Sequence, residues 1–345
     1  MKPIVLVIVG PTASGKSALA VTLAREFGGE VISADSRQVY RGLDIGSGKI
    51  TVTEMQGVPH HLLDITNLYP TSDGRAREQF SVAEYQQLAT EKIEEILTRG
   101  KLPIICGGTG LYVSAIVDDI VLPEVPPNPP LRAELAKVSS EVLFEKLKTL
   151  DPKRASTIDR HNPRRLVRAI EIASALGRVP RLARHDPALA PYEFIELGIS
   201  LPDGILRQKI HDRLVTRLEQ GLIEEVVNLH KHGVSWERLD ELGLEYRYIA
   251  RYLQNQLTRE QMLEQLELAI WHYAKRQLTW FKRDRRIIWL PASGPKPLDQ
   301  QAVDYLQEKL GAPSQAAKKR GKSANRRRDG ATNLSDRKIR GDAKQ

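Results

Sequence analysis

Residues 4–17 read IVLVIVGPTASGKS, and the pattern in this stretch indicates what kind of protein the chain forms. The apolar run Ile4–Val9 predicts a buried strand that ends at Gly10. The following G-x-x-x-x-G-K-S pattern ends at Ser17, and the residues ALAVTLAREF after it predict a helix that stops at Gly28. A strand, a glycine-rich turn and a helix in this order are typical of a phosphate-binding loop.

The residue types of this loop suit a phosphate ligand. Glycines let backbone N–H groups turn toward an anion without a clash from a Cβ atom. The N-terminus of the helix adds unpaired donors and the positive end of its dipole. We expect Lys16 to supply a mobile positive charge and Ser17 a hydroxyl for Mg²⁺. The predicted phosphate-binding residues are Gly10, Pro11, Thr12, Ala13, Ser14, Gly15, Lys16 and Ser17. The pattern predicts a diphosphate or triphosphate ligand and leaves the reaction open.

The composition limits the class of protein. A chain of 345 residues with 41% hydrophobic residues is long enough for two compact units. No apolar run reaches the ~18–20 residues of a membrane span, so no membrane segment is expected. The apolar run near the N-terminus reads as a strand rather than a signal peptide. Cys106 is the only cysteine, which excludes an internal disulfide and fits a cytoplasmic location.

The positive charge is concentrated at the C-terminus. The net charge is +9, but residues 312–345 contain eleven Lys or Arg and three Asp, which leaves the rest of the chain almost neutral. This segment has few large apolar residues and is predicted to be a disordered basic tail. Either it keeps the protein soluble or it adds non-specific attraction to nucleic acid.

Two further strands are predicted to end near the phosphate loop. EVISADS at 30–36 predicts a strand followed by Asp35, and residues 102–106 predict another, followed by GGTGLY with Thr109. Because the C-terminal ends of parallel strands face the ligand, Asp35 is expected to point at whatever lies beyond the phosphates. The alternative is a helix cap or a surface charge. No acidic residue directly follows 102–106, which argues against ordinary ATP hydrolysis.

A second domain is expected within the first. LPEVPPNPP at 122–130 predicts a stiff hinge, and a helical module follows. FIELGISL at 194–201 predicts a return to the sheet. We therefore predict an α/β fold with a P-loop NTPase-like parallel sheet core flanked by helices and an inserted all-helical domain. The expected boundaries are 1–122 and 192–311 for the core, 123–191 for the insertion and 312–345 for the tail.

Basic side chains recur at helical spacing in the second half of the chain. Lys209, Arg213 and Arg217 lie four residues apart on one predicted helix. AKRQLTWFKR at 274–283 mixes cations with aromatic residues on another. Cations interleaved with aromatic rings suit a folded RNA loop, although the aromatic residues also suit a protein core.

Six stretches together make the chain similar to the tRNA dimethylallyltransferase family. The resemblance spans roughly residues 4–290. The stretches are GPTASGKS at 10–17, ISADSRQVYRGLDIG at 32–46, PHHLLDI at 59–65, GGTGLY at 107–112, RRLVRAIE at 164–171 and AKRQLTWFKR at 274–283. The resemblance implies a nucleotide-kinase-like core and an inserted domain that grips the anticodon stem-loop. It implies transfer of a dimethylallyl group from dimethylallyl diphosphate to the exocyclic amine of the adenosine 3′ of the anticodon.

The resemblance also implies roles for individual residues. By motif position Asp35 corresponds to the catalytic base, with Thr12 and Lys16 completing the catalytic set. Arg213 is expected near the diphosphate, and Mg²⁺ is the implied cofactor, held in part by Ser17. The implied tRNA contacts are Asp35, Ser36, Arg37, Gln38, Thr109, Arg132, Arg164, Arg165, Arg168, Lys275, Arg276 and Gln277. We expect a cytoplasmic monomer.

The sequence departs from the family pattern at four places. These are Ile270-Trp271 for a common Thr-Arg, Leu244-Glu245 inserted in a Gly-Tyr-Arg motif, Arg164 for a common Gln, and a long 66–79 loop. Three other functions stay open from the residues alone. One is a small-molecule or nucleoside kinase that uses ATP, another an isoprenyltransferase acting on free adenine nucleotides, and the third an RNA-binding adaptor whose loop only senses nucleotide.

Overall fold

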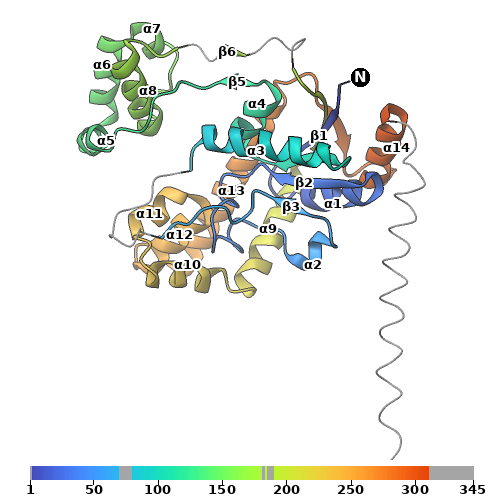
Figure 1. Ribbon diagram of the computed structural model, residues 1–345. Coiled ribbons are helices and arrows are strands. Elements are labelled where there is room, and N and C mark those ends of the chain that lie inside the picture. Colours follow the sequence, from blue (N-terminus) through green and yellow to red (C-terminus); the bar gives the residue numbers. More distant parts are fainter. Residues whose placement is uncertain (1, 70–79, 181–182, 185–189, 311–345) are drawn as a thin grey trace, which may run out of the picture. The chain divides into compact units, whose positions relative to one another are not determined.

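The computed structural model describes residues 2–69, 80–180, 183–184 and 190–310. Most of the 66–79 loop and the whole 312–345 tail lie outside these residues. The chain divides into two compact units. One contains Met1–Val117 together with the chain from Pro191 onward, and the other is Asp118–Ala190. Each unit has its own hydrophobic core, and Figure 1 shows the helices and strands of both units.

The first unit is built on a six-stranded, wholly parallel sheet in the order β3-β2-β4-β1-β7-β8. Its strands are β1 (Ile4–Val9), β2 (Gly29–Ser33), β3 (His60–His61), β4 (Leu102–Gly107), β7 (Glu193–Ser200) and β8 (Ile288–Pro291). In β1, Val5, Val7 and Val9 join one core cluster. Leu6 and Ile8 join another on the opposite face. A strand buried on both faces reads as a continuous apolar run, which explains the pattern at 4–9.

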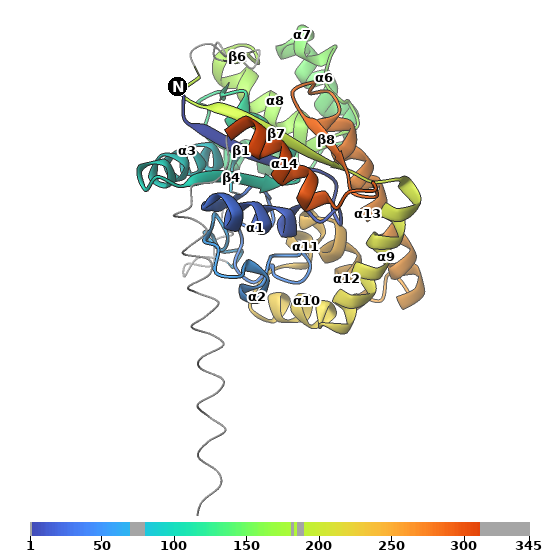
Figure 2. The same cartoon turned by 90° about the vertical axis from the view of Figure 1, so that its right-hand side faces the viewer.

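Helices cover both faces of the sheet. The helices α1 (Lys16–Phe27) and α14 (Leu298–Leu310) pack together over one face (Figure 2). The other face is covered by α3 (Val82–Thr98) and α4 (Gly110–Val117). A capping box between Ser81 and Glu84 fixes the start of α3. The short α2 (Val52–Met55) begins with a second capping box. This two-sided covering is the α/β architecture that the sequence predicted.

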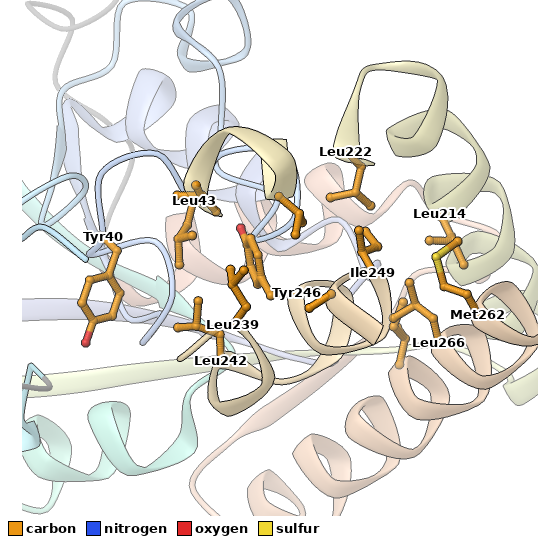
Figure 3. Packing of buried hydrophobic residues seen from close by; sticks show 14 of the residues in the cluster. Tyr40, Leu43, Leu214, Leu222, Leu239, Leu242, Tyr246, Ile249, Met262 and Leu266 are labelled. Atoms are coloured by element: carbon orange, nitrogen blue, oxygen red, sulfur yellow. The ribbon is translucent and has the colours of Figure 1, made fainter. Parts of the chain in front are cut away.

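Five further helices form a second core beside the C-terminal ends of the strands. They are α9 (Asp203–Glu219), α10 (Leu222–Lys231), α11 (Trp236–Leu242), α12 (Leu244–Leu253) and α13 (Arg259–Phe281). Their apolar faces meet around Tyr246, Ile249 and Leu266, and the segment with Tyr40 and Leu43 joins them (Figure 3). This packing brings α9 and α13 against loops that follow the strands, where a ligand site is expected.

The unit Asp118–Ala190 is mainly helical. Its helices are α5 (Pro129–Leu135), α6 (Ser140–Leu150), α7 (Pro152–Ala155) and α8 (Pro163–Leu176). The side chains of Asn128 and Asn162 cap α5 and α8, and each cap is followed by a proline. Where the chain enters and leaves the unit, β5 (Ile120–Val121) and β6 (Ala183–Arg184) pair antiparallel. Across all the described residues, no helix has the length and apolar character needed to cross a membrane.

Candidate active site

The phosphate loop has the backbone geometry that its sequence predicts. Gly10 and Gly15 have φ values of 155° and 93°, and Ala13 has φ 62°. A Cβ atom on Gly10 would lie 3.1 Å from Ser14 Oγ and 3.3 Å from the Ile199 side chain. Close packing and its positive φ therefore favour glycine at position 10, and the left-handed conformation before α1 favours it at position 15. The left-handed Ala13 is a strained conformation of the kind found at ligand sites.

Lys16 lies folded back over this loop. Its Nζ atom donates a hydrogen bond to the Pro11 carbonyl at 2.9 Å. Burial and, to a smaller extent, the positive charge of Arg213 lower the pKa of Lys16 to about 8, although Cys106 and Asp35 act in the opposite direction. The lysine charge is poorly solvated here, so an anion bound beside it would stabilise its protonated form.

A cavity of about 250 Å³ opens in front of the loop. The charged side chains that line it are those of Lys16, Asp35, Arg37, Arg213, Arg217 and Glu245. These are four cations and two carboxylates, an excess of positive charge that favours a polyanionic ligand. Leu242, Leu244, Ile270 and Tyr273 add apolar surface. The cavity therefore suits a ligand with a phosphate end and an apolar end.

Asp35 lies at the cavity in a tight turn directly after β2. Its Oδ1 atom accepts hydrogen bonds from the backbone N–H groups of Arg37 at 2.8 Å and Gln38 at 3.4 Å. The predicted strand at 30–36 ends early, at Ser33, because this turn replaces strand pairing. Thr109 joins the turn to the next loop, since its Oγ1 atom accepts from the Ser36 N–H at 3.0 Å.

Gln277 connects α13 to two loops of the cavity. Its Nε2 atom donates to the Gly108 carbonyl at 2.9 Å, and its Oε1 atom accepts from the Thr12 N–H at 2.8 Å. The residue is buried. The motif suggested a tRNA contact at this position, and that role stays a prediction. The contacts within the protein show Gln277 holding the phosphate loop next to the end of β4.

Arg213 and Arg217 reach the cavity from successive turns of α9. Arg217 pairs with Glu245 at 3.1 Å and donates to the Gly46 carbonyl at 3.3 Å. Burial and the neighbouring Arg217 lower the pKa of Arg213 to about 10. Among the described residues, no carboxylate forms an ion pair with Arg213. The spacing of the basic residues predicted this helix face, but nothing in the sequence pointed to Glu245 as the partner.

Comparison with known proteins identifies the family. The family model described as IPP transferase matches residues 38–284. The tRNA dimethylallyltransferase 1 of Geotalea daltonii is 46% identical over 310 residues, covering 89% of this chain and 94% of that protein. The tRNA dimethylallyltransferase 2 of Trichlorobacter lovleyi is 45% identical over 84% of this chain and 92% of its own length. The chain belongs to the IPP transferase family.

Solved structures of similar proteins have the same fold. The tRNA isopentenylpyrophosphate transferase of Bacillus halodurans is 35% identical, with a TM-score of 0.66, over 92% of this chain and 99% of that one. A eukaryotic dimethylallyltransferase matches with a TM-score of 0.69 at 24% identity, which shows the shared fold alone. The parallel sheet with flanking helices is thus the fold of the IPP transferase family.

Two departures from the family pattern lie at this site. Leu244 has φ 45° and starts α12, where it brings Glu245 to Arg217. Ile270 lines the cavity, and Trp271 is buried with the Arg207 guanidinium 4.3 Å from its ring. Leu244, Glu245 and Ile270 thus line the cavity, and Trp271 packs between α9 and α13.

The remaining predicted tRNA contacts are not among the residues that line the cavity. In the unit Asp118–Ala190, Arg132 and Arg168 both bind Glu171, while Arg164 and Arg165 are exposed on α8. In the first unit, Lys275 pairs with Asp203 at 3.0 Å, and Arg276 is exposed beside Lys275 on α13. These cations stay candidates for tRNA contact, and the structure shows which of them already have a carboxylate partner.

The residues around Ser17 suit a magnesium ion that is bound mainly by substrate phosphates rather than by the protein alone. Ser17 offers a hydroxyl and Asp35 a carboxylate on the wall of the same cavity. The described part of the chain has no cluster of three or more His, Cys, Asp or Glu side chains that would hold a metal by itself. Mg²⁺ commonly keeps several waters and binds through one or two protein groups plus substrate phosphates. The donor set suits a metal delivered with a diphosphate.

Proposed function

We propose that this protein transfers a dimethylallyl group from dimethylallyl diphosphate to tRNA and releases diphosphate. The acceptor we infer is the exocyclic amine of the adenosine 3′ of the anticodon. The relatives named tRNA dimethylallyltransferase support this proposal over most of the chain. The observation that carries it is the cavity in which a phosphate loop, Arg213 and the Asp35 carboxylate lie together.

The part of the cavity formed by the phosphate loop and Arg213 suits stabilisation of a leaving diphosphate. Lys16, the loop amides and Arg213 place positive charge where the C–O bond of the donor would break. Mg²⁺ held by the diphosphate and Ser17 would supply further charge stabilisation. An allylic carbon tolerates positive charge, so the departing anion is the part of the reaction that most needs stabilisation. A phosphate loop serves this purpose without any phosphoryl transfer.

The part of the cavity at Asp35 suits removal of a proton from the acceptor amine. The adenine amine is a weak nucleophile because its lone pair is delocalised into the ring. As its nitrogen bonds to the allylic carbon, the C–O bond breaks, the diphosphate leaves with the electron pair, and the Asp35 carboxylate takes the amine proton. A positioned base of this kind typically contributes about 10²–10⁴-fold. The acceptor base must leave its stack, at a cost of a few kcal/mol that is smallest in a single-stranded loop.

The cations of Asp118–Ala190 and of α13 support a role in gripping the anticodon stem-loop. Lys275 and Arg276 are exposed in the first unit, and Arg164 and Arg165 in the second. Exposed cations on helices suit a phosphate backbone. The cytoplasmic location and the monomeric state stay predictions.

One product analysis tests the proposal against the alternatives. The purified protein is incubated with dimethylallyl diphosphate or with ATP, in each case with tRNA or with AMP, and the products are identified by mass. Our proposal requires a prenylated tRNA and no phosphorylated product. Transfer of a phosphoryl group from ATP would indicate a kinase. Prenylated AMP would indicate a transferase that acts on free nucleotides. Binding of tRNA without any product would indicate an adaptor.

Asp35→Asn tests the assignment of the base. The amide keeps the size and an acceptor oxygen for the turn but takes up no proton, so turnover should fall about 10²–10⁴-fold. tRNA affinity, measured by filter binding, should change little. Asp212→Asn is the matched control, since Asp212 is an exposed carboxylate on α9. Near-normal turnover of Asp35→Asn would remove this residue from the mechanism.

A further inference from the structure

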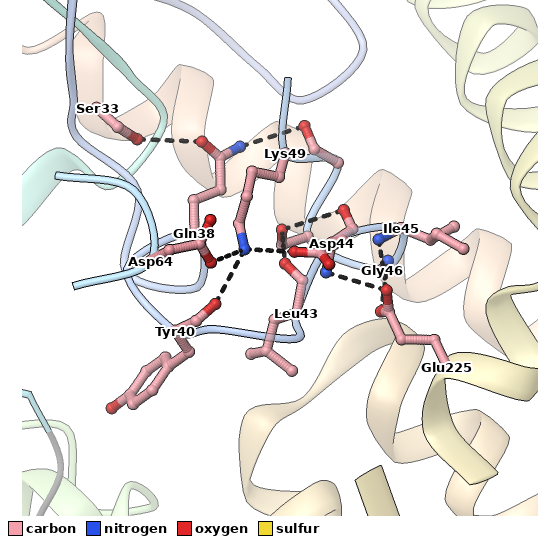
Figure 4. Close-up of polar contacts among 12 residues, drawn as sticks. Ser33, Gln38, Tyr40, Leu43, Asp44, Ile45, Gly46, Lys49, Asp64 and Glu225 are labelled. Carbon is pink, nitrogen blue, oxygen red and sulfur yellow. Dashed lines mark hydrogen bonds and ion pairs between the residues drawn. The ribbon is translucent and has the colours of Figure 1, made fainter. Parts of the chain in front are cut away.

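Glu225 on α10 binds three successive backbone N–H groups of the loop at residues 43–48. The carboxylate accepts hydrogen bonds from Asp44 at 3.0 Å, Ile45 at 2.6 Å and Gly46 at 3.0 Å (Figure 4). Its Oε1 atom also accepts from the Tyr246 hydroxyl of α12 at 3.0 Å. One side chain thus ties the loop to two helices that lie about 180 residues further along the chain.

This arrangement requires a carboxylate. Oε2 receives the N–H groups of Asp44 and Ile45, whereas Oε1 receives that of Gly46 and the Tyr246 hydroxyl. A glutamine has one acceptor oxygen, and its NH₂ group would face two donors. Hydrogen bonds to a charged acceptor are also about twice as strong as those to a neutral one. Changing the acid to its amide therefore removes about half of the contacts at constant side-chain volume.

The loop in turn determines where the cavity arginines lie. The Gly46 carbonyl accepts from Arg217, and the Gly48 carbonyl accepts from Gln38 Nε2 at 3.3 Å. Gly48 has φ 64°, and a Cβ atom there would collide with the guanidinium groups of Arg213 and Arg217. Both guanidinium groups therefore lie directly over the backbone of this loop. A shift of the loop changes their positions.

Lys49, which follows the loop, is a second anchor and holds the two ends of the loop. Lys49 Nζ donates to the Tyr40 carbonyl at 3.0 Å and pairs with Asp44 and Asp64, each at 2.5 Å. The Lys49 side chain is only 7% exposed. Loss of the Glu225 contacts should therefore displace the middle of the loop, next to the arginines, without releasing its end.

We propose that Glu225 is a positioning residue that sets the cavity arginines, through the 43–48 loop, in the place where they bind the diphosphate of the donor. The inference rests on the proposed function for the identity of that donor. It adds that affinity for the diphosphate depends on a carboxylate that lines no part of the cavity.

Glu225→Gln and the matched Glu224→Gln test this positioning role. Glu224 is the neighbouring exposed carboxylate on the same helix. We expect Glu225→Gln to weaken inorganic pyrophosphate binding, measured by calorimetry, about tenfold. The KM for dimethylallyl diphosphate should rise by a similar factor, with the KM for tRNA unchanged. Glu224→Gln should match the wild type in all three. Unchanged pyrophosphate affinity in folded Glu225→Gln would overturn the proposal.

A double-mutant cycle separates positioning from a general loss of stability. If Glu225 acts through the two arginines, Glu225→Gln should have a smaller effect on pyrophosphate affinity once Arg213→Gln is present, since only Arg217 is then left to be displaced. Full additivity of the two changes would contradict the proposal. Tyr246→Phe removes one of the four donors and provides a milder variant in case Glu225→Gln does not fold. It should weaken pyrophosphate binding by a smaller factor, and an unchanged affinity would count against the proposal.

The pyrophosphate measurement also keeps this inference separate from the proposed function. A wild-type protein that binds pyrophosphate but transfers no prenyl group would refute the proposed function. The dependence of that binding on Glu225 would still be measurable. Conversely, the protein could transfer the prenyl group normally while Glu225→Gln left the KM for dimethylallyl diphosphate unchanged. That result would leave the proposed function intact and refute the positioning role.

Discussion

Glu171 and Glu245 are buried glutamates, one in each unit, and they pair with arginines in different ways. In Asp118–Ala190, Glu171 accepts two hydrogen bonds from Arg132 at 2.7 and 2.8 Å, and others from Arg168 and the Asn128 N–H. Those arginines are 40% and 38% exposed. In the first unit, Glu245 has a single arginine partner at 3.1 Å, and both Arg217 and Glu245 are about 10% exposed.

The difference indicates a structural role for the Glu171 pairs and a ligand-binding environment around the Glu245 pair. Burial alone would raise the pKa of Glu171, but the bonds from Arg132 and Asn128 hold it below its usual value. Burial raises the pKa of Glu245, and Arg217 offsets this only in part. The carboxylate in Asp118–Ala190 is thus saturated with donors, which anchors α5 to α8. At the cavity, cations exceed carboxylates, and the excess charge is available for an anionic ligand.

The largest effect is expected from Arg217→Gln, which would leave the Glu245 carboxylate buried without its cation. Removing one partner of a buried pair typically costs about 3–5 kcal/mol in the free energy of unfolding. Glu171→Gln should cost less, about 1–2 kcal/mol, because its arginines are partly exposed and can be solvated. Chemical denaturation of both variants measures the two costs. Equal losses would show that the exposure of the partner left behind does not govern the cost.

A somewhat smaller effect is expected from Arg213→Gln, which removes a cavity cation that has no carboxylate partner among the described residues. Removal of one group that stabilises developing negative charge costs about 10²–10³-fold in rate. We expect kcat/KM for dimethylallyl diphosphate to fall by this factor. Lys209→Gln provides the control, because Lys209 is exposed one turn earlier on α9. If both variants lost activity equally, the general charge of the helix would explain the effect rather than the position of Arg213.

The sequence allowed some parts of this site to be predicted and concealed others. The phosphate loop was predictable because its function depends on backbone conformation, which Gly10 and Gly15 reveal locally. Asp35 was predictable because the ends of parallel strands converge. The partners of Glu225 and Gln277 were not, since they lie 181 and 265 residues away in the chain. A polar side chain that joins such distant segments has no local pattern.

The smallest expected effect is on the pH dependence of stability, which should differ between Glu171 and Glu245. Because the pKa of Glu171 is lower in the folded protein, its contribution to stability is full above the unfolded value of about 4.5 and is lost as the pH falls through the folded pKa. The stability difference between wild type and Glu171→Gln should therefore shrink as the pH is lowered from 7 toward 3.5. Glu245, with a raised pKa, has the opposite sign: ionising it costs stability as the pH rises above about 4.5. Denaturation curves of Glu171→Gln and Glu245→Gln at several pH values measure this, and a difference for Glu171→Gln that grows in acid would contradict the assigned direction.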